Sequence, residues 1–190
     1  MQAIEIAAAL LGLVNVALVV RRSIWNYPFG ILMVALYFFV FFEAKLYSDA
    51  LLQIFFLLIQ LYGWWNWHRS PRLDQGVAVD RLGNAARLVW LAGTGSACLL
   101  WGLGMASFTD AAAPFADAAI AGMSVSAQIL QSLRRVESWL LWIAVDAVAV
   151  PLFWSRGLYF TSALYLLFLL LAVSGLIAWA RRVRPKGAAA

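Results

Sequence analysis

Residues 158–180 read LYFTSALYLLFLLLAVSGLIAWA and contain no Asp, Glu, Lys or Arg. A helix needs about 20 mostly apolar residues to cross the hydrocarbon core of a bilayer, so this stretch predicts a transmembrane helix. The whole chain agrees, because 65% of its 190 residues are hydrophobic and 12% are charged, whereas about 25% of residues are charged in soluble domains. We therefore expect an all-α integral membrane protein.

The same criterion of about 20 mostly apolar residues divides the rest of the chain into further spans with short connections. The first span is expected to be retained, because its basic residues follow the apolar run, whereas those of a signal peptide precede it. An odd number of spans places the termini on opposite sides of the membrane. The seven candidate segments lie near 3–20, 24–42, 46–67, 86–106, 112–132, 138–154 and 158–180.

The Lys and Arg residues predict the direction of insertion, because cytoplasmic loops are enriched in both. With seven spans, 12 of the 14 basic residues fall on one side, and only Lys45 and Arg156 fall on the other. We expect a bacterial inner-membrane protein with its N-terminus outside and its C-terminus in the cytoplasm. This distribution explains the net charge of +5. We expect no nucleic-acid partner, since no basic groove with interleaved stacking residues lies outside the spans.

An internal repeat appears when the chain is shifted by 112 residues. Residues 46–69 then match residues 158–181 at nine of 24 positions without a gap, and the identities include a Gly and a Trp. We predict two three-helix units of the same direction, residues 1–69 and 112–190, joined by a loop and one linking span in 70–111. Such parallel repeats occur in secondary transporters, with the substrate between the repeats. The alternative is that the duplication only stabilises a helix bundle.

The sixth span carries an acid near its centre, Asp146. A carboxylate there costs about 2.5–3.5 kcal/mol, so an intramembrane acid indicates a functional site. Trp139 and Trp142 precede Asp146 by seven and four residues and share its helix face. Tryptophan rings beside an anion suit an aromatic cation. The alternative is that the tryptophans form an interfacial belt and Asp146 pairs with a buried partner.

The third span shows a similar polar face, with Gln53, Gln60 and Trp64 at spacings of seven and four. An amide buried in lipid needs a partner or a ligand, so Gln53 and Gln60 are candidate site residues, although Gln60 could equally join helices. Trp64 could instead belong to an aromatic belt. Gln128 in the fifth span either lines a cavity or ties helices together. Asn26 opens the second span, where a helix cap is the alternative.

No metal or cofactor is expected. A single histidine, His68, excludes a two-His metal motif, and a single cysteine, Cys98, excludes an intrachain disulfide. An intramembrane enzyme is the rival class, but catalytic carboxylates should share one depth. Of five candidate acids, only Asp146 lies near the centre of a span, and the four near span ends are Asp49, Asp110, Asp117 and Glu137. A purely structural membrane subunit, which would bind no ligand, is a third possibility. We expect a protein that is not an enzyme.

Several short motifs follow one another along the chain. They are WNYPFG at 25–30, Gln53 followed by YGWWNW at 62–67, ESWLLW at 137–142 with Asp146, and GLY at 157–159 with Tyr165. At these residues the chain resembles the PnuC family of vitamin transporters. The resemblance covers nearly the whole sequence and is weakest in the loop 70–85 and in the fourth span.

The resemblance implies a SWEET-like 3+1+3 uptake transporter, commonly a homotrimer. It also implies facilitated diffusion with alternating access, and a cytosolic kinase that traps the substrate by phosphorylation. The best-known substrate of the family is nicotinamide riboside, and thiamine and riboflavin are the alternatives. The family pattern W-x-x-W-x-x-x-[ND] falls on Trp139, Trp142 and Asp146. An acid at the last position suits either the nicotinamide pyridinium or the thiamine thiazolium.

The resemblance also implies roles for the candidate residues. Trp142 and Trp139 would stack on the heteroaromatic ring, and Asp146 would offset positive charge or bind hydroxyls. The groups expected to hydrogen-bond the polar part of the substrate are Gln53, Gln128, Asn26 and Tyr165, and Trp64 and Gln60 complete the predicted site.

Overall fold

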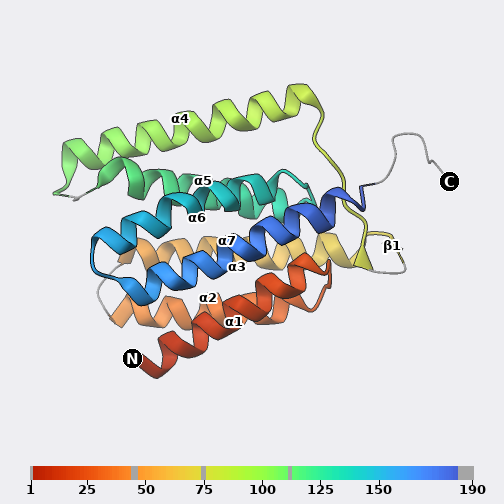
Figure 1. Ribbon diagram of the computed structural model, residues 1–190, viewed down its shortest axis with the longest axis horizontal. Coiled ribbons are helices and arrows are strands. Elements are labelled where there is room, and N and C mark those ends of the chain that lie inside the picture. Colours follow the sequence, from red (N-terminus) through yellow and green to blue (C-terminus); the bar gives the residue numbers. More distant parts are fainter. Residues whose placement is uncertain (1, 44–46, 74–75, 111–112, 184–190) are drawn as a thin grey trace.

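The computed structural model describes residues 2–43, 47–73, 76–110 and 113–183, and its seven helices run roughly along one axis (Figure 1). The observed bounds differ from the predicted spans by no more than two residues. The helices are α1 (Gln2–Val20), α2 (Asn26–Glu43), α3 (Tyr47–His68), α4 (Asn84–Phe108), α5 (Pro114–Ser132), α6 (Ser138–Ser155) and α7 (Tyr159–Ala180).

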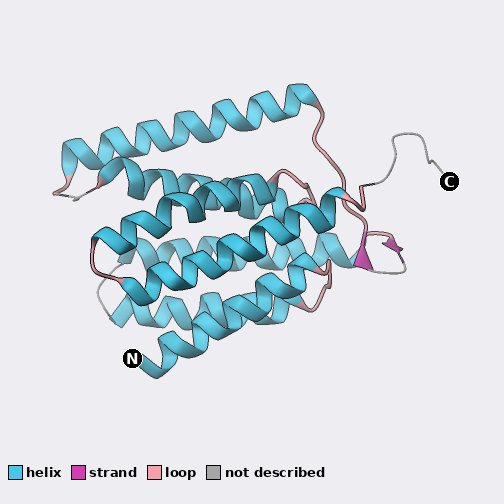
Figure 2. Cartoon of the chain, viewed as in Figure 1, coloured by secondary structure: helices cyan, strands magenta, loops and turns pink. Residues whose placement is uncertain are grey.

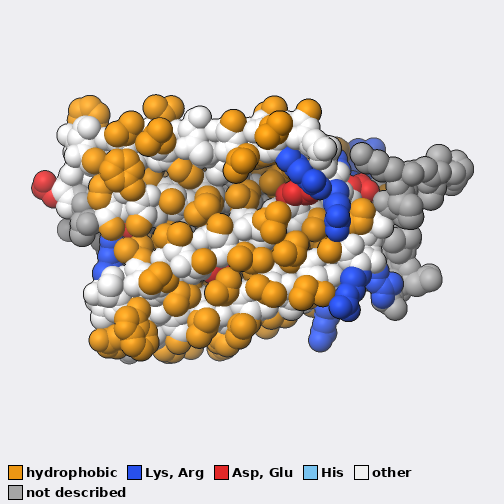
Figure 3. All heavy atoms as spheres, turned by 45° about the horizontal axis from the view of Figure 1, so that its top comes forward, with side chains coloured by type: hydrophobic (Ala, Val, Ile, Leu, Met, Phe, Trp, Pro, Cys, Tyr) orange, Lys and Arg blue, Asp and Glu red, His pale blue; other side chains and the backbone are white. Residues whose placement is uncertain are grey.

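Four helices, α2, α4, α6 and α7, are long and apolar enough to cross a membrane, and α1 carries a shorter apolar segment, Ile6–Val20. Within the described residues α3 and α5 fall outside this group. Both carry buried polar side chains, such as Gln60 on α3 and Gln128 on α5. The two helices also pack on each other, so their polar groups lie inside the bundle. Hydrophobic side chains cover much of the surface in view in Figure 3.

The prediction of an all-α chain misses one small sheet. In the loop between α3 and α4, β1 (Arg72–Leu73) pairs antiparallel with β2 (Gly76–Val77) (Figure 2). Extended backbone outside a helix must satisfy its N–H and C=O groups in another way, and a short hairpin does so. The residues that follow, Val77, Ala78 and Val79, are buried. This loop therefore belongs to the packed part of the molecule.

The helices pack in a ring. In the first half of the molecule α2 lies between α1 and α3, and in the second half α6 lies between α5 and α7. The halves meet where α1 packs on α7 and where α3 packs on α5. These two contacts are equivalent when each helix is exchanged for its counterpart in the other half. Helix α4 packs on α5 and lies along the outside (Figure 1).

Two turns with the same unusual backbone join α1 to α2 and α5 to α6. Arg22 has φ 56° and Arg134 has φ 60°, and these residues are 112 apart. Each follows a helix in a Schellman geometry, with the N–H of Arg22 on the carbonyl of Val19 and that of Ser23 on Leu18. Glycine usually takes such a left-handed position because it has no Cβ. The sequence places an arginine there in both halves.

The buried loop connects the two turns. The N–H of Val77 donates to the carbonyl of Arg22, and the N–H of Asp80 donates to that of Arg134, both at 3.1 Å. In return, the guanidinium of Arg22 donates to Val77 at 3.2 Å and that of Arg134 donates to Ala78 at 3.4 Å. Burial lowers the pKa of both arginines. These side-chain bonds favour arginine at positions where the backbone alone would favour glycine.

Basic side chains gather at the end of the bundle that carries β1 (Figure 3), and we call it the basic end. Arg22 and Arg134 lie at this end, whereas Arg156 lies at the opposite end, between α6 and α7. Three basic residues used to predict the orientation, Lys45, Arg184 and Lys186, lie outside the described residues.

Candidate functional site

Asp146 lies in the middle of α6 and is 3% exposed. Among the described residues, the ion pairs are Arg87 with Glu137 and Arg156 with Asp117, so no basic side chain of this part of the chain neutralises Asp146. A buried acid without a basic partner is unusual and marks a functional site by default. The alternative of a structural ion pair at Asp146 thus finds no partner in the described structure.

Tyr165 lies on α7, the helix that packs along α6 and its acid Asp146. Tyr165, on α7, is within electrostatic range of Asp146 and also of Tyr37 on α2. Its ring packs against Phe153, with the centroids 5.1 Å apart. Sequence reasoning missed Tyr37, because a single phenol in the run 31–42 carries no spacing signal. Asp146, Tyr165 and Tyr37 lie on α6, α7 and α2. We call them the polar group around Asp146, and it forms only when these three helices assemble.

Three helices of the first half meet at a pair of amides. Asn15 and Gln60 are both buried, and Asn15 Nδ2 donates to the carbonyl of Asn26 at 2.7 Å. A Cβ added to Gly30 would clash with both amides, so glycine is required for α2 to approach this closely. Gln60 therefore lies inside the bundle, as predicted for either a site residue or a helix-joining amide.

Asn26 is buried at the start of α2. Its Nδ2 donates to the carbonyl of Ser23 at 2.7 Å. In a standard helix cap the side-chain oxygen accepts from the first turn, so the observed bond is of a different kind. The side-chain nitrogen of Asn26 thus stabilises the turn that precedes α2.

In the second half of the molecule, the side-chain amide of Gln131 accepts a hydrogen bond from Trp142. Trp142 Nε1 donates to Gln131 Oε1 on α5 at 2.7 Å. Gln128, buried on α5, lies three residues before Gln131 and therefore on the same helix face. The sequence analysis did not include Gln131, although its spacing from Gln128 was a usable signal. The bond to Gln131 therefore fixes the orientation of the Trp142 indole.

Trp139 lies near the basic end and not beside Asp146. It is 1% exposed and meets Trp179 edge-on with the centroids 5.5 Å apart. A Cβ on Gly175 would clash with its ring, and its Nε1 has no hydrogen-bond partner in the described part of the chain. Seven residues of helix separate Trp139 from Asp146 by roughly 10 Å. In this conformation the ring that is predicted to stack on a substrate instead packs edge-on against Trp179.

We define the aromatic cluster as Tyr27, Trp67, Trp139 and Trp179. Tyr27 meets Trp67 edge-on at 5.4 Å, which matches the geometry of Trp139 and Trp179, and each residue of the first pair is 112 positions from its counterpart. Val77 and Val79 of the buried loop pack against this cluster. The basic end of the bundle is therefore filled by rings from both halves and covered by the loop.

Two predicted site residues remain, Trp64 and Gln53, and both lie on α3. Trp64 is 38% exposed, stacks on Tyr27 at 6.5 Å and faces a shallow surface beside Trp65. Gln53 is half-buried on α3, two turns from Gln60. It is 112 residues from Tyr165, which is the spacing of the repeat found in the sequence.

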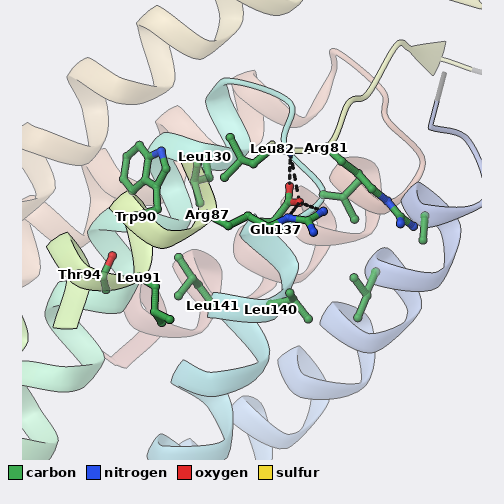
Figure 4. Close-up of a pocket in the computed structure, with 13 residues that line it drawn as sticks. Arg81, Leu82, Arg87, Trp90, Leu91, Thr94, Leu130, Glu137, Leu140 and Leu141 are labelled. Carbon is green, nitrogen blue, oxygen red and sulfur yellow. Dashed lines mark hydrogen bonds and ion pairs between the residues drawn. The ribbon is translucent and has the colours of Figure 1, made fainter. Parts of the chain in front are cut away.

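A crevice of about 450 Å³ lies beside α4 (Figure 4), and none of the nine predicted site residues lines it. Within the described residues, no group of three or more His, Cys, Asp or Glu side chains is placed to hold a metal ion. Cys98, on α4, packs where Gly122 of α5 leaves room for its sulfur. The polar group around Asp146 thus remains the candidate site.

Comparison with known proteins gives matches along the whole chain. A family model described as nicotinamide mononucleotide transporter matches residues 2–181. The nicotinamide riboside transporter PnuC of Escherichia coli (strain K12) is 29% identical over 212 residues, covering 98% of this chain and 89% of that protein. The riboflavin/roseoflavin transporter RibM of Streptomyces davaonensis is 31% identical over 186 residues, covering 95% and 85%. The crystal structure of the vitamin B3 transporter PnuC matches with a TM-score of 0.78 and 26% identity, covering 95% and 81%.

Proposed function

The chain belongs to the nicotinamide mononucleotide transporter family, and from this we propose that it carries nicotinamide riboside into the cell across the bacterial inner membrane. It is a multi-pass membrane protein of a family of vitamin transporters, and the resemblance to the PnuC family is confirmed. The choice of substrate, the mechanism and the site residues are proposals that rest on the geometry described above.

The observation that carries the substrate proposal is the burial of Asp146 without a basic partner among the described residues. A positively charged ligand would supply the missing charge, and the nicotinamide ring of the riboside is a pyridinium cation. Thiamine, which also carries a cationic ring, is the second candidate. The flavin ring of riboflavin is uncharged, so Asp146 gives no reason to prefer it, although RibM is a relative.

We assign the other contacts with the substrate to the remaining candidate residues. Trp142 precedes Asp146 by one turn on the same helix and would stack on the pyridinium, with its orientation held by Gln131. The ribose hydroxyls and the carboxamide need donors and acceptors, which Gln128 and Tyr165 would supply together with Gln53, Gln60 and Asn26. Trp139 and Trp64 would reach the substrate when the aromatic cluster opens.

The two halves differ where a ligand would need them to differ. The position equivalent to Gly30, 112 residues later, is Trp142, so close-packed amides in the first half correspond to an indole in the second. Likewise Asp146 corresponds to Val34, which is buried. Nicotinamide riboside is itself asymmetric, with a charged ring and a hydroxylated sugar. A site with one aromatic, acidic side and one amide side would fit it.

The mechanism that we propose is alternating access by a SWEET-like 3+1+3 carrier, in which units 1–69 and 112–190 rock around the substrate and 70–111 links them. The packing at the basic end supports this proposal, because rings from both units meet there beneath a buried loop. A closed end of this kind would have to open once in every transport cycle. Parallel repeats that move as rigid bodies are a known basis of alternating access.

We further propose that the carrier is passive. The sequence has no Walker motif for ATP, and a cytosolic kinase would trap the riboside as its phosphate. The positive-inside distribution supports a cytoplasmic basic end and an external N-terminus. A homotrimer is proposed from the family resemblance.

An intramembrane enzyme remains the alternative from another class. Of the acids considered for catalysis, Glu137 and Asp117 are engaged in ion pairs with Arg87 and Arg156, and Asp146 lies at a different depth. The described acids are thus not gathered around one reacting atom, and we propose a protein that is not an enzyme.

The proposal is tested by uptake into proteoliposomes that contain the purified protein and labelled nicotinamide riboside, thiamine or riboflavin. We expect nicotinamide riboside to equilibrate across the membrane with or without a pH gradient and to be recovered chemically unchanged. Accumulation above the external concentration in the absence of a kinase would contradict passive transport. Saturable uptake of riboflavin alone would contradict the substrate assignment.

A further inference from the structure

The crevice beside α4 is lined by residues of α4, α5, α6 and α7 and of the loop before α4 (Figure 4). Helix α4 packs on α5 but leaves a gap of about 450 Å³ toward α6 and α7 at the basic end. Its walls are mostly apolar and include Trp90, Leu91, Leu140, Leu141 and Leu176. Leu91 and Leu140 are more than half exposed. All five lie on helices of the membrane domain, so the surrounding solvent is lipid.

The rim of the crevice is charged. Arg87 contacts Glu137 through Nη2 at 2.8 Å and through Nε at 2.9 Å, and the N–H of Leu82 donates to both oxygens of Glu137. The carboxylate of Glu137 is therefore fully engaged. Arg81 lines the same rim, and within the described residues it forms no ion pair. Two cations and one anion leave the rim with a net positive charge.

We propose that this crevice binds one anionic phospholipid, with an acyl chain between α4 and α6–α7 and the phosphate on Arg81 and Arg87. The charge of the rim selects an anionic headgroup, and the apolar walls select a chain. The rim also lies at the end of the bundle where basic side chains gather, which is the depth at which a headgroup resides. The lipid would fill the gap between the linking helix and the second half.

The consequence is structural support for α4. Trp90 and Leu91 on α4 face Leu140 and Leu141 on α6 across the crevice. An acyl chain placed there gives both walls contacts that the protein alone does not supply. The bound lipid therefore stabilises α4 against the second half and raises the melting temperature of the protein.

The test uses native mass spectrometry and thermal melting of the full chain, delipidated in detergent, with added phosphatidylglycerol, phosphatidylcholine or glycerol phosphate. We expect one phosphatidylglycerol per chain and a higher melting temperature. Phosphatidylcholine should bind about fivefold more weakly, as expected from the loss of attraction to one basic residue. Glycerol phosphate, which has the anion but no chain, should give no shift.

Three variants make the test specific. Arg81→Gln should weaken retention of phosphatidylglycerol about fivefold, and Leu140→Trp, which keeps both arginines, should block the chain. Arg156→Gln at the opposite end is the matched control and should bind lipid normally. Equal binding of both phospholipids, or equal effects of Arg81→Gln and Arg156→Gln, would overturn the proposal. A change of oligomeric state in Leu140→Trp with lipid binding intact would instead identify the crevice as an interface between copies. None of these readouts depends on transport.

Discussion

Trp67 and Trp179 pack against each other from opposite halves of the bundle, with ring centroids 5.8 Å apart. Each indole donates its N–H to a carbonyl of the other half, Trp67 to Gln131 at 3.2 Å and Trp179 to Val19 at 3.0 Å. The two donors are 112 residues apart, and so are the two acceptors. The two halves are therefore joined at the basic end by two hydrogen bonds of the same kind, each from an indole N–H to a backbone carbonyl of the other half.

This relationship predicts equal effects of two distant substitutions. Trp67→Phe and Trp179→Phe each keep a ring but remove one hydrogen bond, which alone costs about 1 kcal/mol, and part of a fully buried indole. We expect each variant to lower the melting temperature by at least about 2–4 °C, the shift that 1 kcal/mol gives in a chain of this size. Trp101→Phe, on the exposed surface of α4, is the control and should melt like the parent. If only one of the two paired variants is destabilised, the equivalence of the two bonds is wrong.

The close approaches at two glycines predict large effects of a single methyl group. Gly30→Ala would push against Asn15 and Gln60, and Gly175→Ala against Trp139, so each should cost about 1–3 kcal/mol of overpacking. Gly95→Ala on α4 meets no atom within 4 Å and should be neutral or slightly stabilising, because alanine favours a helix. Thermal melting of the three purified variants checks this. Melting of Gly30→Ala at the temperature of Gly95→Ala would contradict the packing described here.

The bond between Trp142 and Gln131 predicts that an amide on α5 controls substrate affinity through the indole. Trp142→Phe and Gln131→Leu each break the bond and should weaken binding of nicotinamide riboside by a few-fold, while Trp142→Ala should weaken it more. In the Trp142→Phe background, Gln131→Leu should have little further effect, with a coupling energy of about 0.5–1.5 kcal/mol. Calorimetric titration of the four proteins completes the cycle. Additive losses would show that Gln131 acts independently of Trp142.

Most of the architecture could be predicted from the sequence. The thickness of a bilayer sets a length scale that long apolar runs reveal directly, and this is why the helix bounds agree closely. The 112-residue match picked out Gly63, Gly175, Trp67 and Trp179, which all contribute to packing at the basic end. A search for identical residues does not match Tyr27 with Trp139, although they are 112 positions apart, because one is a tyrosine and the other a tryptophan.

Side-chain partners could not be predicted in the same way. Spacing on α6 predicts Trp139, Trp142 and Asp146 on one helix face, but it does not tell which rings pack on protein and which lie near the acid. The burial of Val77 and Val79 depends on backbone bonds to turns that are far away in the sequence. Composition gives no sign of those bonds, and the resemblance to the family is weakest in this loop and in the fourth span.

If Asp146 selects a cationic ring, the protein must discriminate between two nearly identical ligands that differ in the charge of that ring. Nicotinamide riboside carries a positive pyridinium, whereas its dihydro form has the same sugar and an uncharged ring. We expect the purified protein to bind the cationic form about tenfold more tightly, a difference of about 1.4 kcal/mol. Asp117→Asn, which removes an acid near the opposite end of the bundle from the basic side chains, should keep this preference.

The decisive measurement is the same pair of dissociation constants for Asp146→Asn, whose melting temperature would first be checked against that of the parent. We expect this variant to bind the cationic and uncharged forms with equal affinity. A preference for the cationic form that survives unchanged in Asp146→Asn would contradict this expectation.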